Sequence, residues 1–158
     1  MSRKLLAIYL NDHLAGATVG VELVRRAAGA NQGTPLGETL EQLAAEIAED
    51  RESLKRAMSD LDVGEDRIKV AAGWTAEKVG RLKLNGRLIG YSPLSRLVEL
   101  EGLHLGISGK LELWRMLKQT AEARLRGVDL DELIKRAESQ RRRLAPYRKA
   151  AAEQAISP

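Results

Sequence analysis

Two histidines of this chain occupy positions at which a helical pattern calls for apolar side chains. His13 continues a stripe that begins at Leu6, and His104 lies between Leu100 and Ile107 in another stripe. A buried imidazole can satisfy a carboxylate or bind a divalent metal ion. These two residues are therefore the first candidates for chemistry.

Asp50 interrupts a third apolar stripe in the same way. A buried carboxylate without a partner costs several kcal/mol, so we expect a donor, a metal ion or water beside it. His13 and Asp50 each lie about 18 residues from the turn near residues 31 and 32, which at 1.5 Å per residue places them at one height. The spacing predicts a contact between them across two antiparallel helices, with Glu46 one turn away and able to join.

A carboxylate and an imidazole also occur three residues apart, at Glu101 and His104. Side chains at this spacing point from one helix face toward one spot, as in half of a di-iron site. The candidate ligands for iron or another divalent metal are His13, Glu46, Asp50, Glu101 and His104. We favour the alternative in which the two histidines satisfy these carboxylates in a buried polar network without metal.

The elements that must position these residues are helices. Apolar periodicity predicts helices over residues 3–28, 35–60, 66–84, 93–120 and 129–155. Ser2, Thr34, Ser92 and Asp129 are the expected N-caps. Residues 81–91 also fit a short hairpin around Asn85-Gly86. The sequence therefore predicts one all-α domain over residues 1–158, an antiparallel four- or five-helix bundle.

With long paired helices and Glu101 spaced three residues from His104, the chain resembles the ferritin-like superfamily. The resemblance implies two helix pairs, joined by a crossover within residues 61–92. Members that oxidise iron carry a second Glu-x-x-His pair, whereas this chain has Glu46 followed by Glu49. The resemblance thus implies either an altered one- or two-metal site or a ferritin-like bundle without metal.

Glycines are unusually placed within two of the predicted helices. They are Gly16, Gly20, Gly102, Gly106 and Gly109. Each costs about 1 kcal/mol relative to alanine in a helix interior. Close packing of the two helix backbones is the explanation we favour, and a cavity for a ligand is the alternative. Trp74 and Trp114 are expected to be core or dimer-interface anchors rather than a cofactor clamp.

Composition excludes several kinds of site. The chain has 158 residues, no cysteine and no phenylalanine. Disulfides, thiolate zinc sites, iron–sulfur clusters and thiol nucleophiles are therefore excluded. The apolar run after Lys4 is too short for a signal peptide core or a membrane span. We expect a cytoplasmic protein without a membrane segment.

Charge is distributed unevenly along the chain. Residues 36–66 are acidic, and the C-terminal helix carries Arg141, Arg142 and Arg143. These arginines could contact nucleic-acid phosphates or the acidic helix. We favour a solvated helix surface and expect no nucleic acid partner, since no nucleic-acid recognition fold accompanies the basic residues.

The absence of a complete site favours a non-catalytic protein over an enzyme. We expect an interaction or structural protein that forms a homodimer and has room for a protein partner. Metal binding through the five candidate ligands is the first alternative, and nucleic-acid association through the C-terminal helix is the second.

Overall fold

The computed structural model describes residues 2–66 and 91–156, which form long helices and no strand. The helices are α1 (Arg3–Ala30), α2 (Pro35–Asp60), α4 (Pro93–Ala121) and α5 (Leu130–Ile156), with a short 3₁₀ turn, η1 (Glu122–Arg124), before α5. The all-α prediction is confirmed for this part of the chain, and four predicted helices agree with it to within two residues at each end. The helix predicted over 66–84 and the hairpin considered for 81–91 lie outside the described residues.

The predicted N-caps explain where these helices begin. The hydroxyls of Ser2, Thr34 and Ser92 accept from the backbone N–H three residues later, at 3.3, 3.1 and 3.1 Å. The Asp129 carboxylate accepts from the N–H of Glu132 at 3.0 Å. Each contact satisfies one of the backbone donors that a helix leaves free in its first turn.

The turn between α1 and α2 depends on one glycine and one asparagine. A Cβ atom on Gly37 would lie 2.2 Å from the carbonyl oxygen of Asn31, so no other residue fits there without moving the backbone. The Asn31 side chain donates to the Ala27 carbonyl and to the Tyr91 hydroxyl, and it accepts from Arg96. The end of α1 is thereby connected to the start of α4.

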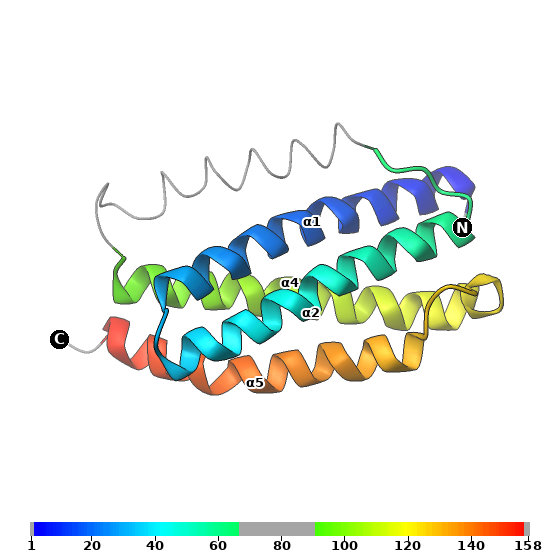
Figure 1. Cartoon of the computed structure of the whole chain (residues 1–158). Coiled ribbons are helices and arrows are strands. Elements are labelled where there is room, and N and C mark those ends of the chain that lie inside the picture. Colours follow the sequence, from blue (N-terminus) through cyan, green and yellow to red (C-terminus); the bar gives the residue numbers. More distant parts are fainter. Residues whose placement is uncertain (1, 67–90, 157–158) are drawn as a thin grey trace.

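The four helices lie side by side (Figure 1) and pack around a mainly aliphatic core. Helix α1 contacts α2 and α4, and α5 contacts α4 and α2. Arg3 near the start of α1 donates to the carbonyl of Asp62, just beyond the end of α2. Arg96 near the start of α4 donates to Gln154 near the end of α5. The fully buried large side chains are Trp114, Leu10, Leu14, Leu40, Leu43, Met58, Leu61, Leu100, Leu111, Leu113, Leu117 and Leu144.

Two further expectations concern the tryptophans and a membrane segment. Trp114 is a core residue, as predicted, while Trp74 lies outside the described residues. Among the helices of residues 2–66 and 91–156, none is long and apolar enough to span a bilayer.

Candidate functional site

A cluster of charged and amide side chains lies in the middle of the bundle, around Asp50. Asp50 is 2% exposed, and its Oδ2 accepts from the ammonium of Lys110 and from Gln140 Nε2, the latter at 3.0 Å. Arg136 Nε lies 2.8 Å from Asp50 Oδ1 as an ion pair without the alignment of a hydrogen bond. The buried carboxylate therefore has its partners on α4 and α5.

Gln140 extends this cluster to a second carboxylate of α2. Its side chain is fully buried. Its Oε1 accepts from Lys110 at 2.6 Å, and its Nε2 also lies 3.1 Å from Glu46 Oε2. Glu46 in turn accepts from Arg143 Nη2 at 2.5 Å. One amide thus joins a lysine to two carboxylates, and α2, α4 and α5 meet at this point.

The charges of the cluster are balanced. The acids are Glu46, Glu49 and Asp50, and the bases are Lys110, Arg136 and Arg143. Burial lowers the pKa of the Lys110 ammonium, while Asp50 acts in the opposite direction. A buried charge of this kind is tolerated only with a close counter-charge and hydrogen bonds, and both are present.

The structure does not bring the five predicted metal ligands together. Glu46 and Asp50 are held by the cations described above, and Glu101 is exposed on α4. His13 packs edge-on against Tyr9, with ring centroids 4.6 Å apart. The carboxylates are therefore neutralised by lysine and arginine, and neither histidine is their partner.

The predicted contact between His13 and Asp50 is wrong, because Lys110, Gln140 and Arg136 occupy the carboxylate. The two residues nevertheless line one pocket, in agreement with the similar height along the helices predicted for them. In the part of the chain that the structure describes, no three His, Asp or Glu side chains are grouped so that they could hold a metal ion. The metal-site prediction has no support in these residues.

His104 of α4 lies near Arg141 and Arg148 of α5. Its Nδ1 is buried and has no hydrogen-bond partner. Burial lowers its pKa, and the charges of Arg148 and Arg141 lower it further. Burial also lowers the pKa of His13, with Asp12 acting in the opposite direction. Both imidazoles are thus favoured in their neutral form.

We therefore expect the protein to lose stability in mild acid through these histidines. Both folded pKa values lie below the ordinary value of 6.5, so the unfolded chain takes up protons first as the pH falls. The stabilisation is complete above about pH 6.5 and is lost as the pH falls from there toward the folded pKa values. Urea unfolding of the wild type and of the double variant His13→Gln, His104→Gln, at about pH 7.5 and about pH 5.5, measures this effect. An equal loss in both proteins would show that other groups cause the pH dependence.

The basic residues of α5 divide between two roles. Arg143 and Arg136 bind carboxylates of the acidic helix α2, while Arg142 is exposed. Contact with the acidic helix, one of the two contacts considered for the arginines, is thus observed for Arg143. The set of Arg141, Arg142 and Arg143 does not form one free phosphate-binding surface.

Lys110 and Gln140 were not predicted from the sequence, and Arg136 was expected only as one of the bases that could contact phosphates or the acidic helix. A signal existed for Gln140, because it lies between Ala137 and Leu144 in the apolar stripe of α5, as Asp50 does in α2. Lys110 and Arg136 lie beside such stripes, and their long side chains reach inward. The position of a lysine or arginine beside an apolar stripe does not show whether its side chain extends into the core.

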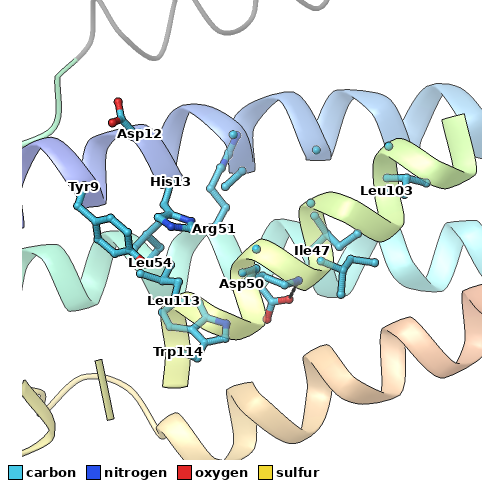
Figure 2. Close-up of a pocket in the computed structure, with 18 residues that line it drawn as sticks. Tyr9, Asp12, His13, Ile47, Asp50, Arg51, Leu54, Leu103, Leu113 and Trp114 are labelled. Carbon is cyan, nitrogen blue, oxygen red and sulfur yellow. Dashed lines mark hydrogen bonds and ion pairs between the residues drawn. The ribbon is translucent and has the colours of Figure 1, made fainter. Parts of the chain in front are cut away.

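A pocket of about 420 Å³ lies between α1, α2 and α4. All five glycines that interrupt the predicted helices line it, together with mostly apolar side chains. Figure 2 shows His13 and Tyr9 of α1 facing it, with Leu54, Leu113 and Trp114 nearby and Asp50 beside them. The pocket borders the polar cluster through Asp50 and Lys110.

Close packing of the two glycine faces, the explanation favoured from the sequence, is wrong for most of these glycines. A Cβ atom built on Gly16, Gly20, Gly106 or Gly109 would meet no described atom within 4 Å. Only Gly102 is in close contact, with Leu23 Cδ2 at 3.3 Å from its Cβ position. The alternative considered from the sequence, a cavity, describes the observed arrangement.

Comparisons with protein-family models, with curated proteins and with solved structures gave no match to this chain. The pocket and the polar cluster are therefore the observations from which function is inferred.

Proposed function

We propose that this protein is a non-catalytic helical bundle that binds a small, mostly apolar molecule in the pocket between α1, α2 and α4. The carrying observation is that four glycines keep space open at the cost of helix stability. Each glycine in a helix interior costs about 1 kcal/mol relative to alanine. An alanine at Gly16, Gly20, Gly106 or Gly109 would meet no described neighbour, so packing does not explain the glycines.

The size and the lining of the pocket support this proposal. Pockets that enclose small organic ligands have volumes of about 300–1,000 Å³ and mostly apolar walls with a few polar groups. The volume here is about 420 Å³, and the apolar walls are interrupted by the polar side chains of Tyr9, Asp12, His13, Asp50, Arg51 and Lys110. A compact organic molecule fits this description better than a metal ion, a nucleic acid or a substrate that needs a catalytic constellation.

We also propose that the bundle has the ferritin-like arrangement, with the antiparallel pairs α1/α2 and α4/α5. The contacts of Arg3 with Asp62 and of Arg96 with Gln154 support this arrangement. Homodimer formation, with room for a protein partner, stays a prediction.

The test places a leucine in the pocket from α1 or from α4 and compares dye affinity with that of a matched variant outside the pocket. N-phenyl-1-naphthylamine is a neutral apolar dye whose fluorescence rises when it leaves water. We expect it to bind the wild type and to lose at least about tenfold in affinity in Gly16→Leu and in Gly106→Leu, since a leucine there occupies the ligand's space. Gly29→Leu is the control, because Gly29 lies in α1 with open space around it and does not line the pocket.

All three variants should be as stable as the wild type or more stable, by about 0.5–1 kcal/mol each, because leucine is a better helix former than glycine. Urea unfolding measures this and shows that a loss of dye binding is not a loss of fold. The proposal fails if the wild type does not bind the dye, or if the pocket variants bind it as tightly as Gly29→Leu does.

A further inference from the structure

One buried donor at the pocket has no acceptor among residues 2–66 and 91–156. Trp114 is fully buried and lines the pocket, and its Nε1 has no hydrogen-bond partner. An indole N–H can only donate, and a buried N–H without an acceptor costs about 1–3 kcal/mol. In Figure 2 the indole nitrogen lies on the side of the ring toward Asp50, which lies in the middle of the labelled lining residues.

Lys110 offers a second donor beside Asp50. Its ammonium carries three N–H groups, and Asp50 and Gln140 accept two of them. Lys110 also lines the pocket. Next to Asp50 the pocket therefore has donors beyond those that acceptors of the described residues use.

The net charge of the neighbouring cluster determines whether a charged or a neutral acceptor is favoured beside these donors. The neighbouring cluster contains three carboxylates and three cations, Glu46, Glu49 and Asp50 against Lys110, Arg136 and Arg143. A ligand carboxylate placed there would add an uncompensated buried negative charge, and a ligand ammonium would add a positive one and a further donor. A neutral oxygen acceptor adds no charge and can accept from both donors.

Resting on the proposed function, we propose that the ligand is a neutral, mostly apolar molecule with a carbonyl oxygen, which accepts hydrogen bonds from Trp114 Nε1 and Lys110 Nζ. The apolar body of the molecule lies along the glycines of α1 and α4, and the carbonyl lies beside Asp50 and Lys110.

A matched set of probes tests this proposal. Benzophenone and diphenylmethane have the same two rings and differ only in a carbonyl in place of a methylene, and diphenylacetate adds a carboxylate. In equilibrium dialysis with the wild type we expect benzophenone to bind about tenfold more tightly than diphenylmethane, because the ketone pairs with donors that the hydrocarbon leaves unpaired. Diphenylacetate should bind more weakly than benzophenone.

The variant Trp114→Phe keeps an aromatic ring and removes the N–H. It should reduce the preference for benzophenone while leaving the affinity for diphenylmethane within about twofold. A second measurement needs only the wild type: near-ultraviolet irradiation attaches benzophenone at its carbonyl carbon to a nearby C–H bond, and mass spectrometry locates the adduct. We expect the adduct on residues 110–114.

The outcomes separate this inference from the proposed function. If diphenylmethane and benzophenone bind equally, or if the adduct lies at Tyr9 or Asp12, the pocket binds apolar molecules but the carbonyl assignment is wrong. If neither compound binds, the proposed function fails together with the inference. Tighter binding of diphenylacetate than of benzophenone would overturn the charge argument and point to an acidic ligand.

Discussion

Replacing Asp50 by asparagine is expected to lower the free energy of unfolding by about 3–5 kcal/mol, because it leaves two cations in the bundle without their central counter-charge. Lys110 and Arg136 both contact the Asp50 carboxylate, and the Asp50 side chain is 1% exposed. Asparagine has nearly the same shape, so the loss reports charge and hydrogen bonding rather than a cavity. Urea unfolding at neutral pH measures it.

Two further variants make this test specific. Adding Lys110→Met to Asp50→Asn removes one of the cations that the first change leaves without a counter-charge. The double variant should therefore lose less free energy of unfolding than the sum of the two single variants, as expected for groups in direct contact. Glu138→Gln is the control, because Glu138 pairs with Arg115 at the surface, where ion pairs contribute at most about 1 kcal/mol. A loss in Asp50→Asn no greater than that in Glu138→Gln would mean that the cluster adds no stability.

The second large effect is expected for Trp114→Ala, a loss of about 3–5 kcal/mol in the free energy of unfolding. Trp114 is the largest fully buried side chain, and the chain has no phenylalanine to share its role. Truncation would join the space that it leaves to the existing pocket. Chemical unfolding, followed by circular dichroism at about 222 nm, where the signal reports helix content, gives the difference in the free energy of unfolding.

Leu105→Ala on the same helix is the matched control for this variant. Leu105 is 71% exposed, so its truncation should change stability by no more than about 0.5 kcal/mol. If Trp114→Ala were as well tolerated as Leu105→Ala, the indole would contribute little to the core, and its burial would need another explanation.

Local sequence signals were sufficient for most of the fold. The caps at Ser2, Thr34, Ser92 and Asp129 depend on contacts three residues apart, so the beginnings of the helices could be predicted without knowing their neighbours. The buried stripes follow from helical periodicity in the same way. Helix pairing across the chain is a longer-range property, and for it the sequence offered only the short link near residues 31 and 32.

The candidate site was predictable only in part. Asp50 was identified as a buried acid that needs a donor, and this prediction is confirmed. The donor was assigned to His13 because only height along the helices could be compared, whereas the rotation of each helix decides which side chain meets the carboxylate. Lys110 contacts Asp50 from another helix, α4, a relation that no spacing within one helix encodes.

The glycines show a related limit. Their cost to the helices could be calculated from the sequence, but the same cost is compatible with two backbones in contact and with an open space. In α4, Gly102 is close to the Leu23 side chain, whereas Gly106 has open space around its Cβ position. Only the distances between helices distinguish them.

The polar cluster also bears on the handedness of the bundle. A core in which leucine is the commonest residue discriminates poorly between a bundle and its mirror topology, in which the helices follow one another around the axis in the opposite sense. Asp50, Lys110 and Gln140 come from three different helices, and α1 contributes none of the cluster's charges. The mirror arrangement turns at least one of these side chains away from the other two and leaves charge buried without a partner. The cluster therefore selects one topology from two that the leucines alone would accept.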